Sequence, residues 1–115
     1  MLEDLKFHHI GIAVKNFERS LSYYQRLGYK RLNQDIVRDK LQKVDLILLQ
    51  HDSHPDVELV SPFDNNSPIG KYLENSDVAM YHLCYEVDDF NYVVNSLKKE
   101  FRVMCVVKPK PAILF

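Results

Sequence analysis

Two histidines and one glutamate have the residue types and the spacing that could hold a metal ion. His9 and His82 occupy equivalent positions in a stretch that occurs twice, 73 residues apart, and Glu58 stands between apolar neighbours. Imidazole nitrogens suit Zn, Ni, Co or Fe, and a nearby carboxylate completes a mixed nitrogen and oxygen ligand set. If both histidines point inward in a pseudo-twofold arrangement, they face each other across its axis. The three residues therefore indicate a divalent metal site.

Each of these residues also has an alternative explanation. His9 and His82 could be half-buried side chains that hydrogen-bond to backbone carbonyls, which is the commoner role of a single histidine. Glu58 could face solvent, since the side chains of a strand alternate between its two faces. The residues alone leave these alternatives open, although repetition at matched positions favours the metal.

The other histidines, Cys84 and Glu86 are weaker candidates for metal ligands. His8 directly precedes His9, so alternation along the strand places it on the opposite side, away from the metal. Cys84 and Glu86 share a strand face with His82 and could each supply a ligand. Packing in the core or at its rim is the preferred interpretation of both. Two further histidines in a polar turn are expected to be solvated: His51 and His54.

The repeat determines the expected architecture. Residues 7–17 align with residues 80–90, and in this register His9 falls on His82. Two copies are too few for a solenoid of stacked repeats. They suit a pseudo-symmetric domain made from two equivalent modules.

Apolar periodicity predicts a βαβββ first module over about residues 5–62. Asn16 is placed to cap its helix, and Gly28 is placed to follow the last helical turn. A polar connection is expected over 35–41. The expected elements are a strand at 6–14, a helix at 17–27 and strands at 29–33, 44–49 and 57–61.

A linker over residues 63–77 and a partial second module over 78–115 complete a single domain, 1–115. Ser67 and Pro68 are typical of a helix start, as N-cap and first helical residue, so the linker should contain a short helix. The second module is truncated relative to the first. Its expected elements are a strand at 79–87, a helix at 90–100 capped by Asp88 or Asp89, and a strand at 102–107.

Composition excludes several classes of protein. The 115 residues carry a net charge of −1, so a nucleic-acid-binding surface, which needs clustered basic residues, is not expected. No apolar run approaches the roughly 20 residues that a membrane helix requires. The N-terminus has no signal-peptide pattern, so Cys84 and Cys105 are expected to be reduced thiols of a cytoplasmic protein.

Six segments, taken together and in order, carry a resemblance to a known family: His9–Val14, Ser22–Tyr29, Leu41–Val44, Val57–Pro62, Asn66–Leu73 and His82–Asp89. They resemble the vicinal oxygen chelate superfamily, also called the glyoxalase/bleomycin-resistance/dioxygenase fold, and within it the methylmalonyl-CoA epimerase-like branch. The resemblance covers nearly the whole chain. It implies an α+β glyoxalase-like domain, in which paired βαβββ modules form an open, curved, barrel-like sheet around one divalent metal ion (Zn, Ni, Co, Mn or Fe).

The resemblance assigns roles to residues at matching positions. It implies that three of the family's metal ligands are His9, Glu58 and His82. A fourth family ligand, a glutamate also tied to acid/base chemistry, belongs to a last strand of the second module that this sequence does not contain. The family's other acid/base glutamate, just before the glutamine matched by Gln42, is replaced by Leu41. The catalytic residues therefore stay unassigned, and Gln42 is the expected substrate-binding residue.

The resemblance implies a metal-dependent isomerase, epimerase or lyase of the methylmalonyl-CoA epimerase or lactoylglutathione lyase type. Such an enzyme stabilises an enolate of a carboxyl, thioester or 2-oxo substrate by chelation through two adjacent oxygens. The alternative is a non-catalytic, small-molecule-binding module of the resistance type. His9, Glu58 and His82 favour the enzyme, whereas Leu41 and the missing last strand of the second module favour the binding module. The resemblance also implies a homodimer, and the expected partner is a small-molecule substrate, with no nucleic acid and no membrane.

Overall fold

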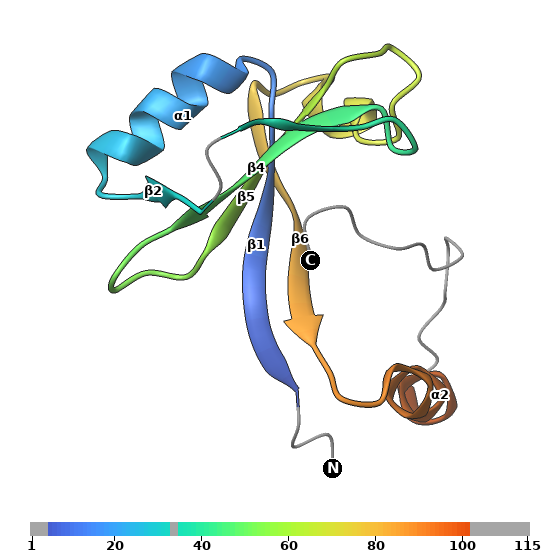
Figure 1. Cartoon of the computed structure of the whole chain (residues 1–115). Helices are drawn as coiled ribbons and strands as arrows, with labels where there is room; N and C mark the ends of the chain where they lie inside the picture. Colours follow the sequence, from blue (N-terminus) through green and yellow to red (C-terminus); the bar gives the residue numbers. More distant parts are fainter. Residues whose placement is uncertain (1–4, 33–34, 102–115) are drawn as a thin grey trace.

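The computed structural model describes residues 5–32 and 35–101 of the chain, which form one mixed sheet with two α-helices and a short 3-10 helix (Figure 1). The elements are β1 (Lys6–Val14), α1 (Phe17–Arg26), β2 (Lys30–Arg31), β3 (Val37–Asp39), β4 (Val44–Gln50), β5 (Val57–Pro62), η1 (Gly70–Leu73), β6 (Val78–Glu86) and α2 (Phe90–Phe101). The strands follow the order β2-β4-β5-β1-β6, and β3 pairs with β4. β1 is parallel to β5 and antiparallel to β6, so β1 is the strand through which the first module pairs with the second.

Helix α1 covers one face of the sheet. It begins where predicted because the side-chain oxygen of Asn16 accepts a hydrogen bond from the backbone N–H of Arg19, at 3.0 Å. After its last turn comes Gly28, whose φ of 99° is the left-handed conformation that favours glycine. Leu21 is the buried residue of α1 on this face, and Phe17 and Tyr24 pack against the same core as partly buried side chains. The buried residues of this α1-side core are Ile12, Val14, Leu21, Tyr29, Ile47, Leu49, Val57 and Leu59.

Removal of the α1 cap should cost a modest amount of stability. Asn16→Ala takes the side-chain acceptor away from the N–H of Arg19, and we expect the free energy of unfolding to fall by about 1 kcal/mol. Urea unfolding measures this change, and Asn16→Asp, which keeps an acceptor oxygen, is the matched control. Equal losses in the two variants would contradict a stabilising role for the cap bond.

The opposite face of the sheet packs on the linker that follows β5. Ile69 and Leu73 are buried there against side chains of β1, β4 and β5. The predicted linker helix is present as the 3-10 turn η1, but the prediction that Ser67 caps it is wrong. The Ser67 hydroxyl donates instead to the backbone carbonyl of Gln42, at 2.9 Å. This bond ties the linker to the β3–β4 turn.

The connection predicted over 35–41 contains a short strand, β3, which the sequence pattern did not predict. Arg38 donates two hydrogen bonds to the carboxylate of Asp45 on β4, at 2.8 and 3.0 Å. Such a charged cross-strand pair supports pairing where a three-residue strand has little apolar surface to bury. The segment is polar, so it has no apolar pattern from which this strand could be predicted.

The described part of the second module contains β6 and α2, as predicted. Asp89 caps α2, because its side-chain oxygen accepts a hydrogen bond from the N–H of Tyr92 at 3.0 Å. The predicted strand at 102–107 lies outside the described residues. The α+β class with an open, curved sheet is confirmed (Figure 1), whereas the module boundaries stay predictions.

Among the described helices, none is both long enough and apolar enough to cross a membrane.

Candidate metal centre

Three neighbouring strands bring the predicted ligands together on the sheet face opposite α1. Gly11 of β1 pairs with Glu58 of β5 on one side and with His82 of β6 on the other. His9 lies two residues before Gly11, so alternation directs it to the same face. Ile12 of the same strand belongs to the α1-side core, on the other face.

The ligand atoms of the three residues converge on one point. His9 Nε2 lies 3.0 Å from His82 Nε2, and Glu58 Oε1 lies 3.7 Å from His9 Nε2 and 3.8 Å from His82 Nε2. Nitrogen and oxygen ligands bound to a tetrahedral zinc at about 2.0–2.1 Å stand about 3.3 Å from one another. The observed separations bracket that value, so the structure brings together the three residues that the sequence singled out.

Glu58 is buried, so the alternative that it faces solvent is wrong. Its side chain is 9% exposed and that of His9 is 2% exposed, whereas the side chain of His82 is 32% exposed. The centre is therefore closed by β1 and β5 and more open beside His82 on β6.

The surroundings set the protonation states that a metal site needs. Burial, followed by the charges of His82 and His8, lowers the pKa of His9 to about 4, and burial lowers the pKa of His82. Both imidazoles are therefore neutral at neutral pH and offer a nitrogen lone pair. Burial, followed by the negative charge of Asp39, raises the pKa of Glu58 to about 7. A cation would stabilise the Glu58 carboxylate, so this donor set fits a divalent metal.

Two β-bulges in the pairing of β1 with β6 shape the centre. The register shifts at His8 on β1 and at Tyr81 on β6, each directly before a histidine of the centre. The two bulge residues are equivalent in the repeat, and each ring packs on the next histidine, with centroids 5.1 Å apart on β1 and 4.4 Å apart on β6. A bulge interrupts the alternation of side chains. His8 therefore lies beside His9, with 2.8 Å between their Nδ1 atoms, and the prediction that it lies on the opposite side is wrong. It is not one of the three residues whose ligand atoms converge on the centre.

Gly11 is a residue of the site that sequence reasoning missed. A Cβ built at this position would lie under 3.0 Å from three atoms of the His82 ring, namely Cε1, Nδ1 and Nε2. The missing side chain thus leaves the space that the imidazole occupies. The available signal was the glycine itself, because glycine inside a strand often marks the close approach of another group.

The β3–β4 turn holds Leu41 and Gln42, which the resemblance had singled out. Buried Asp39 accepts hydrogen bonds from the N–H groups of both residues, at 2.9 and 3.2 Å, and from the Gln42 side-chain amide at 3.2 Å. Leu41 is 68% exposed. The structure thus holds Gln42 on Asp39, the residue whose charge helps to raise the pKa of Glu58. A role of Gln42 in substrate binding stays a prediction.

Three further residues of metal-binding types lie outside the His9, Glu58 and His82 group: Cys84, Glu86 and His51. Cys84 lies close to His8 and His9, whereas Glu86 is exposed at the end of β6. His51 is half-buried, and its Nε2 makes a solvent-exposed hydrogen bond with the C-cap carbonyl of α1 at 3.0 Å.

Comparison with known proteins identifies relatives. A family model described as "Glyoxalase/Bleomycin resistance protein/Dioxygenase superfamily" matches residues 8–112. The mitochondrial methylmalonyl-CoA epimerase of Dictyostelium discoideum is 26% identical over 109 residues, which cover 94% of this chain and 63% of that protein. The ethylmalonyl-CoA/methylmalonyl-CoA epimerase of Cereibacter sphaeroides is 30% identical over 108 residues, which cover 91% of this chain and 78% of that protein.

A solved structure supports the same relationship at the level of the fold. The crystal structure of methylmalonyl-CoA epimerase from Mycobacterium tuberculosis has a TM-score of 0.72 and 24% identity, and the match covers 83% of this chain and 63% of that chain. The chain thus spans less than two thirds of the Dictyostelium and Mycobacterium proteins that it matches. The resemblance carried by the six segments is confirmed: the chain belongs to the Glyoxalase/Bleomycin resistance protein/Dioxygenase superfamily.

Proposed function

We propose that this chain carries the metal centre of a glyoxalase- or epimerase-like enzyme that acts on a carboxyl, thioester or 2-oxo substrate. The observation that carries the proposal is the convergence of His9, Glu58 and His82, with every pair of ligand atoms within 4.8 Å. The relatives named as methylmalonyl-CoA epimerases make a CoA thioester the first substrate class to try.

The chain's own residues would hold one divalent cation and admit the substrate. His9, Glu58 and His82 supply two neutral nitrogens and one carboxylate oxygen, which leaves coordination positions for other ligands. When bound, the cation would supply a Lewis acid for two adjacent substrate oxygens. His82 lies on the more exposed side, so a small molecule would enter there. Gly11 leaves room for the His82 ring, and Tyr81 packs on it. Zn, Ni, Co, Mn and Fe are all candidates for the cation.

Hydrogen exchange at the α-carbon of methylmalonyl-CoA tests the enzyme directly. With a divalent metal added in D2O, the wild-type chain should replace the α-hydrogen with deuterium faster than metal in buffer does. His9→Ala should lose this exchange, and His54→Ala, a histidine outside the centre, should keep it. Mass spectrometry follows the incorporation of deuterium.

One observation favours the second candidate, a non-catalytic binding module. Leu41, at the position that the resemblance gives to an acid/base glutamate, presents an exposed apolar side chain. Stoichiometric metal binding and substrate binding, with no exchange of any carboxyl, thioester or 2-oxo substrate, would contradict the enzyme and support this candidate.

The affinity for a divalent metal should depend on pH through Glu58. Because the pKa of Glu58 is raised to about 7, metal binding below that pH must displace a proton from its carboxyl. As the pH falls from about 6.5 to about 5.5, the apparent Kd for the metal should therefore rise about tenfold. Above about pH 7.5 it should no longer change with pH. In Glu58→Gln, whose amide oxygen can coordinate without titrating, the dependence over this range should be flat. Equal slopes in the two proteins, measured by calorimetry, would contradict coordination by Glu58.

Our proposal includes a homodimer. The second module presents large exposed apolar side chains on β6 and α2, among them Met80 (66%), Leu83 (54%) and Phe101 (68%), and apolar patches of this kind mark interfaces. Sedimentation equilibrium should give the mass of two chains, and Met80→Lys should shift it toward one. A monomer at all concentrations would contradict the dimer. A cytoplasmic location also stays a proposal.

A further inference from the structure

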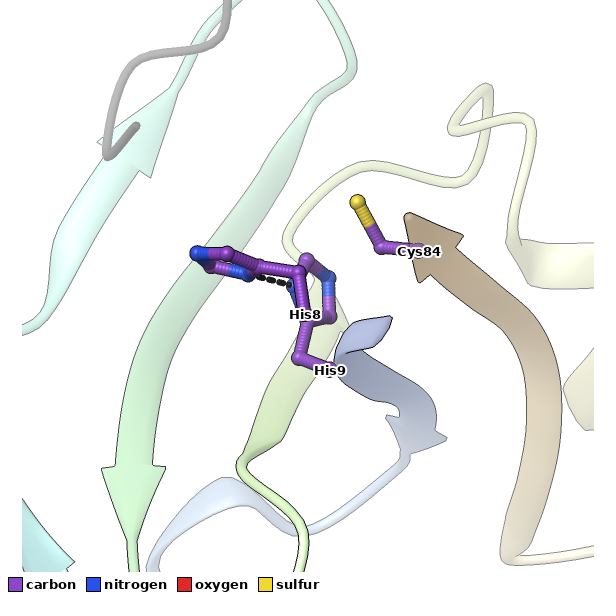
Figure 2. A group of neighbouring side chains, drawn as sticks. All are labelled: His8, His9 and Cys84. Carbon is purple, nitrogen blue, oxygen red and sulfur yellow. Dashed lines mark hydrogen bonds between the residues drawn. The ribbon is translucent and has the colours of Figure 1, made fainter. Parts of the chain in front are cut away.

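A second group of metal-binding side chains lies on the other side of His9. The ligand atoms of His8, His9 and Cys84 all lie within 4.8 Å of one another. His8 Nδ1 is 2.8 Å from His9 Nδ1. Figure 2 shows the two rings on β1 in an edge-to-face arrangement, with the Cys84 side chain beside them on β6. Two nitrogens and one sulfur thus converge where two strands pair.

The same bulge and the same repeat build this group. The bulge at β1 adds His8 to the side on which His9 lies, and Cys84 is the β6 residue that pairs with His9. In the repeat, Cys84 is the equivalent of Gly11, which pairs with His82 in the same way. Gly11 of the first module therefore leaves room for the imidazole of His82. The equivalent residue of the second module, Cys84, places a thiol beside the imidazole of His9.

We propose that His8, His9 and Cys84 form a second metal site, selective for soft cations such as Cd2+ or Cu+. Thiolate sulfur selects soft metals, and imidazole accepts them. Zinc binds nitrogen at about 2.0–2.1 Å and sulfur at about 2.3 Å, so an ion of that size would need the two nitrogens, now 2.8 Å apart, to part by about 0.5 Å. A larger ion such as Cd2+ would need them further apart, which rotation of the two rings would provide. His8 and Cys84 are half-buried, so an ion can reach them and water can complete the coordination. The Cys84 thiol releases its proton to the buffer as the sulfur–metal bond forms.

His9 makes the two sites mutually exclusive. Its Nε2 faces Glu58 and His82, and its Nδ1 faces His8. A neutral imidazole carries its proton on one nitrogen and its lone pair on the other. A cation bound to Nδ1 leaves the proton on Nε2, which then has no lone pair for the first centre. A soft cation at the second site therefore withdraws a ligand from the first centre.

Titration of the metal-free chain with Cd2+ tests the site, with the ultraviolet thiolate-to-cadmium absorption as the signal. Cys105→Ser is present in every protein, so Cys84 is the thiol that reports. We expect the band to saturate at about one ion per chain, because the two sites share His9. Cys84→Ser should abolish the band, and His8→Ala should weaken the apparent affinity for Cd2+ by at least about tenfold. Glu58→Gln, which alters only the first centre, should keep both the band and the affinity.

Several results would overturn the proposal. The site does not exist if the protein that carries only Cys105→Ser shows no absorption band with Cd2+. It also does not exist if adding His8→Ala to that protein leaves its Cd2+ affinity unchanged. Two Cd2+ ions bound together would overturn the mutual exclusion. Circular dichroism establishes whether each variant is folded. If Cys84→Ser does not fold, the Cd2+ affinity of His8→Ala decides whether the second site exists. Failure of the first centre alone would leave these results unchanged, since neither Glu58 nor His82 belongs to the second site.

Discussion

His82→Ala should lower the affinity of the chain for divalent metal by more than about 100-fold. Removal of a residue that only orients a metal ligand typically costs 10–100-fold in affinity, so loss of a ligand itself should exceed that range. His82 Nε2 lies 3.0 Å from His9 Nε2 and 3.8 Å from Glu58 Oε1, and in its absence one nitrogen and one oxygen remain. Two ligands hold a cation much less tightly than three do. Calorimetric titration of the metal-free proteins measures the difference.

The fold should survive this substitution. The His82 side chain is 32% exposed, and a partly exposed ring on β6 contributes little core packing. Circular dichroism and thermal unfolding should therefore match wild type closely in the absence of metal. His54→Ala, which removes an exposed histidine of the turn before β5, is the control for affinity. An unchanged metal affinity in His82→Ala would contradict the assignment of this residue as a ligand.

Gly11→Ala should disable the metal centre although Gly11 supplies no ligand atom. The new Cβ would overlap the His82 ring at Cε1, Nδ1 and Nε2, and Gly11 is buried between β5 and β6. The ring must rotate away, so the affinity for divalent metal should fall by more than about 100-fold, as in His82→Ala. The overpacking should also cost about 1–3 kcal/mol of unfolding free energy. Gly70→Ala is the matched control, because a Cβ there meets no atom within 4 Å.

A double-mutant cycle separates this steric mechanism from a general loss of stability. In the His82→Ala background, the added Cβ at Gly11 has no imidazole to displace. Gly11→Ala should then cost little further metal affinity, and its cost in unfolding free energy should shrink, which gives a large coupling energy between the two positions. Additive effects would contradict a direct clash between the Cβ and the ring.

The repeat predicted the histidine pair, because equivalent residues of two modules meet where their first strands pair. His9 and His82 are found on adjacent strands in that arrangement. The position of Glu58 could not be derived from alternation alone, since either face of β5 was open to it. The parallel pairing of β1 with β5, which places Glu58 opposite Gly11, is long-range information that no local pattern contains.

Local rules failed where the chain departs from regular geometry. Alternation predicted that His8 lies on the opposite side of β1 from His9, but a bulge brings the two rings together, with their Nδ1 atoms 2.8 Å apart. A capping pattern predicted that Ser67 begins a helix, but its hydroxyl bonds to the distant carbonyl of Gln42. Asp39 gave no signal in the sequence, because its influence on Glu58 acts through space. Tertiary contacts decided each of these positions.

Metal content, measured by elemental analysis, tests the central claim most directly. The protein is purified without chelator and without nickel affinity, and wild type is compared with His9→Ala. His9 belongs to both groups of ligands, so its loss removes every site described here. We expect about one divalent ion per wild-type chain and essentially none in the variant. Stoichiometric metal retained by His9→Ala would contradict a metal centre built by these residues.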